Sequence, residues 1–164
     1  MPRFVLVFAG VLVGLFTLEM LEPVQAGVVQ PFTSWIASLS AAIIMPFDDA
    51  VIAYGRVIEH TTGQFAVSIE SGCNGVEATI VLIAGVVAFP ASWGQRLLAI
   101  LLGFFAIQVL NLARIISLFY LGQWNLEIFT WTHLYLWPVL IMLDVLLVFA
   151  LYLRYLTPEQ VEPA

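Results

Sequence analysis

The chain has 164 residues, of which 62% are hydrophobic and only 10% are charged. Soluble domains are about half apolar and about a quarter charged, so this composition excludes an ordinary soluble domain. The five basic residues are all arginines, and eleven acidic residues give a net charge of -6. No basic patch or basic–aromatic run is present, so nucleic acid is not expected as a partner. The length fits a single integral-membrane domain over residues 1–164.

The first apolar run extends from Phe4 to Leu18 and continues weakly to Leu21. Arg3 before it and Val24-Gln25-Ala26 after it also fit a secretory signal with a small-residue cleavage site. The run is long, however, and Thr17-Leu18-Glu19-Met20 is a poor approach to such a site. We therefore expect a retained transmembrane helix over about 4–21. Both alternatives send the following residues outward across the membrane.

Three further apolar segments are predicted to span the membrane, at about 76–90, 97–119 and 134–153. A span needs about 20 apolar residues, so the first of these is short and would thin the bilayer locally. Residues 28–46 are also apolar, but they include Pro31 and several hydroxyl side chains. We expect this segment to form a short helix at the membrane surface.

Arginine positions favour four spans with both termini in the cytoplasm. In that arrangement Arg3, Arg96 and Arg154 all lie inside, as the positive-inside rule prefers. A fifth span would place Arg3 and Arg154 on opposite sides. The segment of about 22–75 is then extracytoplasmic. Tryptophans agree, since Trp93 marks the inner boundary and the others near the spans cluster at the outer one: Trp124, Trp131 and Trp137.

A short β-structure is predicted within the extracytoplasmic segment. Gln64 to Glu70 alternates apolar and other residues, which is typical of a strand. Val51 to Ile58 is a weaker partner, with Thr61-Thr62-Gly63 as the turn between them. The predicted fold is an all-α polytopic membrane protein of about four transmembrane helices, with a surface helix and a small extracytoplasmic β-hairpin. The hairpin leads directly into Cys73.

Three chemically distinctive side chains are expected at the outer ends of the spans. Cys73 just precedes the second span, and His133 just precedes the fourth. Arg114 lies 17 residues after Leu97, a helix rise of ~25 Å that places it within a turn or two of the outer surface. The topology therefore predicts that all three residues face the same water interface.

A thiol, a guanidinium and an imidazole together are suited to acyl transfer. Thiolate formation is favoured at a helix N-terminus and beside a cation, and Cys73 would meet the first condition if a helix began near Asn74. His133 would exchange protons with the thiol and the leaving amine. Arg114 would hold the oxyanion or the substrate backbone. Gly75 would leave room for a peptide.

Other roles for these residues remain open. Cys73 is the single cysteine and cannot form an intramolecular disulfide, so it is a core thiol, an intermolecular link or a nucleophile. Arg114 could extend its guanidinium to the surface without any other role, although a charge so closely flanked by apolar residues is usually functional or paired. Glu77 lies four residues after Cys73 and is expected to form a structural ion pair rather than to take part in catalysis. Gln108 and Asp144 lie deeper and are expected to hydrogen-bond across helices.

Around these residues the sequence resembles the exosortase/archaeosortase family of membrane-embedded sorting enzymes. The resemblance covers roughly Val51 to Leu146. Within the family, the sequence is most similar to exosortase H. Many exosortases are larger and have spans that this chain lacks. The matching strings are Cys73-Asn74-Gly75-Val76-Glu77-Ala78, then Asn111-Leu112-Ala113-Arg114-Ile115, then His133 at the start of the final helix.

The resemblance implies a cysteine protease or transpeptidase of the bacterial inner membrane with its active site on the extracytoplasmic face. It would cleave exported proteins at a C-terminal signal composed of a short motif, a transmembrane helix and a basic tail. The subtype implies an Ile-Pro-Thr-Leu motif. Cys73 would form a thioester, Arg114 and His133 would complete the site, and four residues would support it or bind substrate: Asn74, Gly75, Glu77 and Asn111.

No cofactor and no metal are expected, and the expected partners are the exported substrates and membrane lipid. Two alternatives from other classes remain. One is a non-catalytic membrane scaffold or protein-sorting assembly factor. The other is a small channel subunit, which requires a polar stripe through the bilayer, whereas the polar residues here concentrate at one face.

Overall fold

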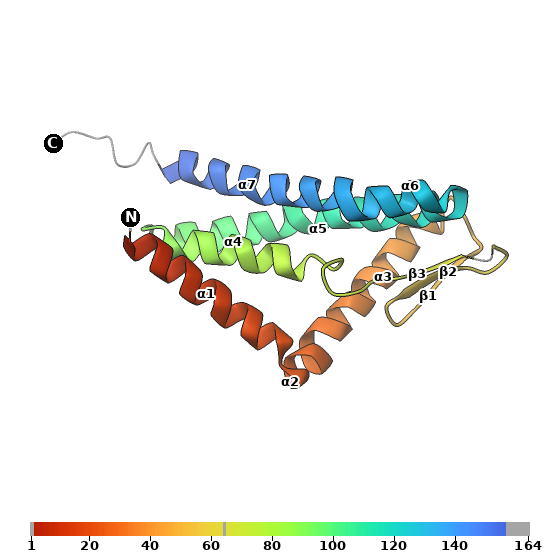
Figure 1. Cartoon of the computed structure of the whole chain (residues 1–164), viewed down its shortest axis with the longest axis horizontal. Helices are drawn as coiled ribbons and strands as arrows, with labels where there is room; N and C mark the ends of the chain where they lie inside the picture. The colour runs from red at the N-terminus through yellow and green to blue at the C-terminus, as the bar shows by residue number, and fades with distance from the viewer. Residues whose placement is uncertain (1, 64, 157–164) are drawn as a thin grey trace.

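The structure is a computed structural model that describes residues 2–63 and 65–156, and helices make up most of it (Figure 1). Nine helical segments and three strands follow one another along this part of the chain. In order they are α1 (Pro2–Met20), α2 (Glu22–Val24), the π-helical turn η1 (Gln25–Val29), α3 (Gln30–Ile44), β1 (Val51–Tyr54), β2 (Val57–His60), β3 (Ala66–Ser68), α4 (Val76–Ala88), α5 (Trp93–Trp124), α6 (Leu126–Trp131), the π-helical turn η2 (Thr132–Leu136) and α7 (Trp137–Leu156).

Four helical segments of the described chain are long and apolar enough to cross a membrane: Pro2–Met20, Glu22–Ile44, Trp93–Trp124 and Leu126–Leu156. The number agrees with the prediction, but the set differs. The predicted surface helix is part of the continuous 23-residue segment Glu22–Ile44. The predicted second span is the 13-residue helix α4, whose rise of roughly 20 Å is less than the ~30 Å thickness of the hydrocarbon core.

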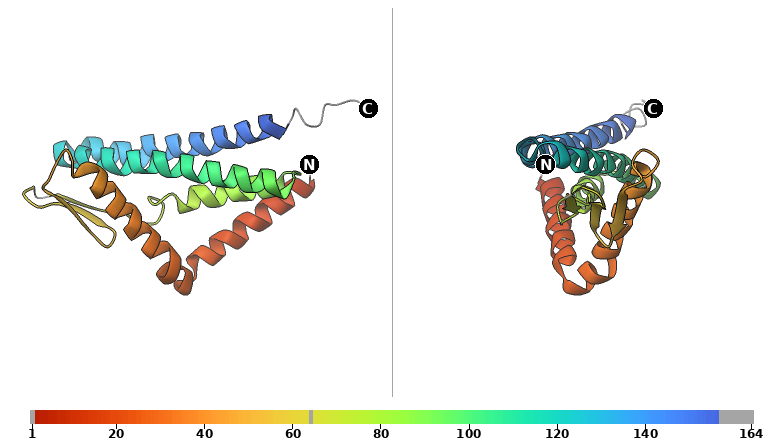
Figure 2. Two further views of the ribbon diagram at one scale, coloured as in Figure 1. Left: turned by 180° about the vertical axis from the view of Figure 1, so that it is seen from behind. Right: turned by 90° about the vertical axis from the view of Figure 1, so that its right-hand side faces the viewer.

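The helices divide the molecule into two ends (Figure 1). The start of α1, the end of α4 and the end of α7 lie at one end, and α3, the sheet and α6 lie toward the other. Helix α4 packs against α1, α5 and α7. Helices α1 and α3 diverge from a bend at α2, so that they form a V in both views of Figure 2.

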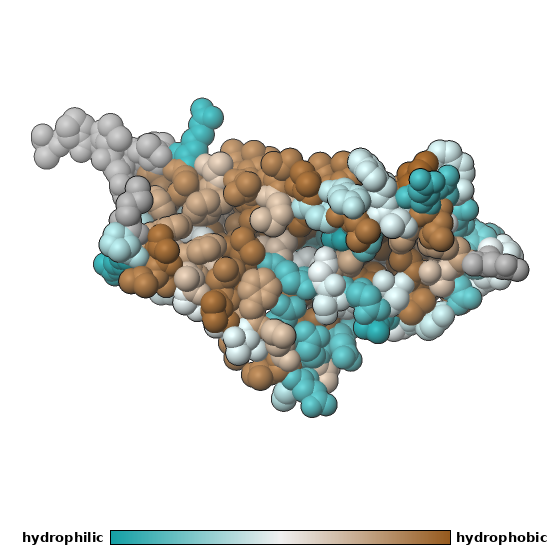
Figure 3. All heavy atoms as spheres, in the orientation of Figure 1, coloured by the Kyte–Doolittle hydropathy of each residue, from teal (hydrophilic) through white to brown (hydrophobic). Residues whose placement is uncertain are grey.

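The surface toward the termini is the hydrophobic part of the molecule, while polar side chains gather around the bend and the sheet (Figure 3). On α5, Leu102 and Phe105 expose 62% and 63% of their surface, and on α7, Leu147 exposes 58%. Soluble monomers rarely expose apolar patches of this extent, and lipid covers such a surface at no cost. The exposed helix faces are therefore those of an integral membrane protein.

The β-structure is a three-stranded antiparallel sheet in the order β1-β2-β3, rather than the predicted hairpin. The predicted strand from Val51 to Ile58 is interrupted, because Gly55 adopts a φ of +53° and turns the chain between β1 and β2. Val67 of β3 pairs with Ile58 of β2, as the alternating pattern predicts. The first residue of that predicted strand, Gln64, lies outside the described residues.

The sheet is fixed to the helices by a core of fully buried side chains. Ile36 and Ile44 of α3, Val51 and Ile58 of the sheet, and Phe119 of α5 expose 2% of their surface or less. A second core joins α4, α5 and α7. Because the loop from β3 to α4 connects these two cores, both of its ends are held in place.

Gly103 lets α5 approach α4 and α7 closely. A Cβ atom there would lie 2.3 Å from Leu82 Cδ2 and 2.8 Å from Val148 Cγ1. We predict that Gly103→Val overpacks this contact, at a cost of about 1–3 kcal/mol, and lowers the melting temperature in detergent followed by tryptophan fluorescence. The control is Gly14→Val in α1, where a Cβ has no neighbour within 4 Å. Equal losses in both variants would contradict this packing.

Candidate functional site

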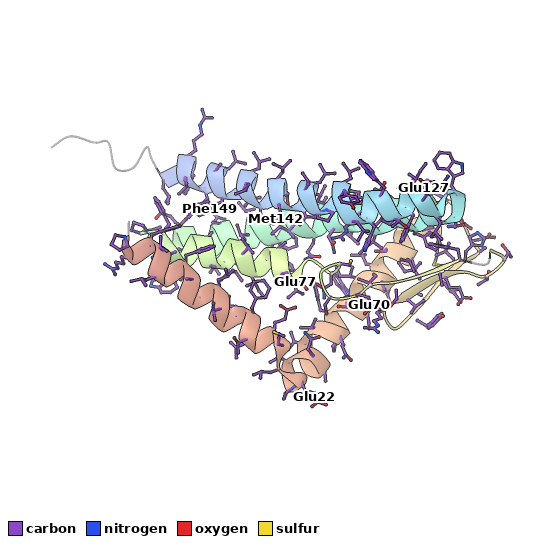
Figure 4. All side chains as sticks on the ribbon, viewed as in Figure 1. Glu22, Glu70, Glu77, Glu127, Met142 and Phe149 are labelled. Atoms are coloured by element: carbon purple, nitrogen blue, oxygen red, sulfur yellow. The ribbon has the colours of Figure 1, made fainter. Side chains whose placement is uncertain are left out.

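Cys73 lies in the loop between β3 and α4; Glu70 within this loop and Glu77 in the first turn of α4 are labelled in Figure 4. Its backbone N–H donates to the carbonyl of Glu70 at 2.9 Å and closes a turn. Gly72 and Gly75 on either side have φ angles of +82° and +79°, a region that favours glycine. The side chain of Cys73 is half-buried.

Arg114 reaches this loop from α5 and is 5% exposed. Its Nη2 donates to Cys73 Sγ at 3.3 Å, and its Nη1 donates to the carbonyl of Gly72 at 3.1 Å. Within residues 2–63 and 65–156, no carboxylate forms an ion pair with this guanidinium. A buried cation without a counterion attracts negative charge strongly in its surroundings. The guanidinium is therefore suited to stabilise a thiolate or an oxyanion.

His133 is positioned by the π-helical turn η2. This turn, in which the N–H of Trp137 donates to the carbonyl of Thr132, precedes Pro138 and keeps the helix continuous from Leu126 to Leu156. His133 thus precedes α7, but the continuous helical segment that contains it begins at Leu126, earlier than the predicted start near residue 134. The imidazole stacks on Phe129 with ring centroids 5.7 Å apart. Its Nδ1 is buried and has no hydrogen-bond partner in the described chain.

The three predicted residues line one cavity of about 120 Å³. Strand β3 and the loop form one side of it, and α5, α6 and η2 form the other. The structure therefore brings Cys73, Arg114 and His133 together from segments that are far apart in sequence. The remaining lining residues are Val67, Ser68, Ile69, Glu70, Ile115, Leu118 and Phe129.

The electrostatic environment of Cys73 differs from the prediction. Burial raises the pKa of the Cys73 thiol, Arg114 lowers this pKa, and the carboxylates of Glu77 and Glu70 raise it, with a net increase. Helix α4 begins at Val76 with Gly75 as its N-cap, so the sulfur lies before the helix rather than at its first turn.

Asn74 and Glu77 hold the loop rather than line the Cys73 cavity. Asn74 is 1% exposed, accepts a hydrogen bond from the N–H of Val76 and donates to Thr33 Oγ1 of α3 at 3.0 Å. The backbone N–H of Gly72 donates to the Glu77 carboxylate. These contacts fix the conformation on both sides of the thiol. The ion pair expected for Glu77 is absent from the described residues.

Gly75 and Asn111 occupy tightly packed positions. A Cβ on Gly75 would lie 2.6 Å from Nε2 of Gln108, so a larger residue would force that side chain to move, and the φ of +79° would also be strained. Asn111 is completely buried on α5, and neither of its amide atoms has a hydrogen-bond partner in the described part of the chain. It lines a second cavity, of about 290 Å³, on which Arg114 also borders.

Within the part of the chain that the structure describes, Gln108 and Asp144 do not make the hydrogen bonds expected across the helices. The Gln108 amide and Asp144 Oδ2 are buried without a hydrogen-bond partner within residues 2–63 and 65–156. No group of three or more histidine, cysteine or acidic side chains in the described residues is arranged to hold a metal ion.

Two residues of the site were missed at the sequence level. Phe129 lies one helical turn before His133, and this spacing of four residues was a usable signal. Thr33, which anchors Asn74, lies 41 residues away from it. No local pattern connects two positions that far apart, so only the packing of α3 reveals the contact.

Residues 2–154 match the family model of the transmembrane exosortases. No curated protein and no solved structure matched the chain. The matched region extends from α1 nearly to the end of α7 and includes every element that builds the site. This integral membrane protein therefore belongs to the transmembrane exosortase family.

Proposed function

We propose that the protein is a membrane-embedded cysteine protease or transpeptidase that cleaves the C-terminal sorting signals of exported proteins through a thioester on Cys73. The observation that carries the proposal is the contact of the buried Arg114 guanidinium with Cys73 Sγ, in a cavity that His133 also lines. Family membership supports the same type of enzyme. The proposed substrates carry an Ile-Pro-Thr-Leu motif, a transmembrane helix and a basic tail.

In the first step of this mechanism, Cys73 Sγ attacks the carbonyl carbon of the scissile peptide bond while the thiol proton passes to the imidazole of His133. The carbonyl oxygen becomes negatively charged, and the Arg114 guanidinium stabilises it. The C–N bond then breaks, and His133 returns the proton to the leaving amine. The product is a thioester that an acceptor amine or water cleaves, which regenerates the thiol.

Because the pKa of Cys73 is raised, the mechanism requires a base that removes the thiol proton. Because burial outweighs the attraction of Arg114, the resting site holds a thiol at neutral pH. The imidazole is the side chain in the same cavity that can accept the proton at this pH. Attack thus waits until a substrate displaces water and brings its carbonyl to the sulfur.

The proposed site faces the extracytoplasmic side of the bacterial inner membrane, with both termini in the cytoplasm. The arginine distribution supports this orientation, since Arg3, Arg96 and Arg154 would all lie inside. The start of α1 and the end of α7 also lie at the same end of the molecule, away from the sheet (Figure 1). Exported proteins would then meet the site on the side to which they are delivered.

The proposal is tested by co-expressing the enzyme with an exported reporter that carries an Ile-Pro-Thr-Leu tail. Cys73→Ser, Arg114→Ala and His133→Ala are each expected to lower cleavage at least about 100-fold, because each removes one part of the mechanism. Cleavage is followed by the size of the reporter, and membrane insertion of each variant is measured in parallel.

His60→Ala is the matched control for the histidine, because His60 pairs with Asp48 at the sheet and does not line the cavity. It is expected to retain normal cleavage. Unchanged cleavage by Cys73→Ser would remove the thiol from the mechanism and leave the scaffold alternative in its place.

The pH dependence of Cys73 alkylation tests the electrostatics. Since the pKa of the thiol is raised, the rate of its reaction with iodoacetamide is expected to rise with pH, and this rise is expected at a higher pH than for an ordinary exposed cysteine. Arg114→Gln removes a charge that lowers this pKa, so its rate profile is expected to shift to still higher pH. Arg154→Gln, at an exposed position in the last turn of α7, is the control. A shift to lower pH in Arg114→Gln would contradict the proposed role of the guanidinium.

Gly75→Ala tests whether the loop conformation is essential. The substitution strains a φ of +79° and forces a Cβ against Gln108, which costs about 1–3 kcal/mol and displaces Cys73. Cleavage is expected to fall at least about tenfold, and adding Gln108→Ala is expected to restore part of it. Gly55→Ala has similar backbone strain, at +53°, without any neighbour within 4 Å, and is expected to cleave normally.

A further inference from the structure

The second cavity shares Arg114 with the first but is not lined by His133, and the site described above leaves it without a role. Its volume is about 290 Å³, and helices α1, α4, α5 and α7 all contribute to its walls. Glu77 and Met142, both labelled in Figure 4, line it from α4 and α7. Most of the wall is apolar and comes from Phe16, Val81, Ile141 and Met142.

The polar part of the wall is Asn111 beside Arg114, together with the carboxylate of Glu77. That carboxylate accepts a hydrogen bond from the N–H of Gly72. Asn111 is 0% exposed, and among the described residues its Nδ2 and its Oδ1 both lack a hydrogen-bond partner. Arg114 Nε, at the boundary of the two cavities, is likewise buried without a partner in residues 2–63 and 65–156. Buried polar groups are almost always paired, so these atoms await a ligand. A primary amide offers one acceptor and two donors, which matches a peptide group.

The second cavity also lies deeper along the helices than the first. On α7 and its preceding turn, the first cavity uses His133 and the second uses Met142. These positions are nine residues apart, a separation of roughly 13 Å along a helix. Gly72 and Arg114 are joined by a hydrogen bond and border the second cavity beside Cys73. A chain that occupies both cavities must therefore pass the sulfur.

We propose that the second cavity is a substrate subsite that holds an apolar residue next to the scissile bond, with Asn111 paired to the peptide group of that residue. The identity of the natural occupant rests on the proposed function. The unpaired amide favours a polypeptide over a lipid tail, because an acyl chain has no group that can hydrogen-bond to Asn111.

Alkylation of Cys73 tests this subsite without enzyme turnover. The purified full chain is treated with iodoacetonitrile, which has no amide, or with N-butyl iodoacetamide, which has an amide and an apolar group beyond it. Each rate is divided by the rate of the same reagent with a small free thiol. The ratio of the two normalised rates cancels changes in the thiol itself. We expect this ratio to favour N-butyl iodoacetamide at least about fivefold, the factor that one amide hydrogen bond with partial burial supplies.

Two variants and one matched control complete the experiment. Asn111→Leu removes both polar groups at similar volume, and Val81→Phe fills the cavity; both are expected to reduce the ratio to about one. Val109→Phe makes the same change at a lipid-facing position of α5, where 68% of the side chain is exposed, and is expected to keep the wild-type ratio. Because two different variants are used, a folding defect in either one leaves the other as the test.

A ratio that stays high in both variants would overturn the proposal, because partitioning into detergent would then explain it. A ratio that falls in Val81→Phe but not in Asn111→Leu would also overturn it, since the cavity would then bind an acyl chain. Failure of the proposed function is recognised separately, by normal cleavage in Cys73→Ser. That result does not alter the alkylation ratio.

Discussion

The site depends on one buried cation. Arg114 projects from an apolar helix, and the described chain gives it a sulfur and a backbone carbonyl as partners rather than a carboxylate. Burying a guanidinium with only these two partners is unfavourable unless a negatively charged group compensates its positive charge. The contact with the Gly72 carbonyl also fixes the loop that carries Cys73. One side chain thus positions the sulfur and supplies the positive field in which an oxyanion would form.

The loop is held between two independently packed regions. The sheet and α3 form one core with the C-terminal half of α5. In the other core, α4 packs with α5 and α7. Asn74 attaches the loop to Thr33 of α3, and Gly75 seats it against Gln108 of α5. Because the thiol lies between these anchors, its position relative to Arg114 is set by tertiary packing and not by the helix that follows it.

The two cavities share Arg114 as a common wall. The outer one contains the sulfur and the imidazole, and the deeper one is apolar except at Asn111, Arg114 and Glu77. This division matches a substrate whose chain runs from water into an apolar environment at the cleaved bond. The resting thiol, with its pKa raised by burial, would remain unreactive until such a chain excludes water from both cavities.

Composition and periodicity by themselves determined the membrane class, the number of long apolar helices, β-structure before Cys73 and the identity of the three clustered residues. Their limits have physical causes. The π turn before Pro138, the split strand at Gly55 and the start of α4 at Val76 depend on backbone geometry that hydrophobic patterns do not encode. The raised thiol pKa, the anchor at Thr33 and the cavity at Asn111 arise from burial between distant segments. Only the tertiary structure decides which side chains lose water together, and that loss controls their chemistry.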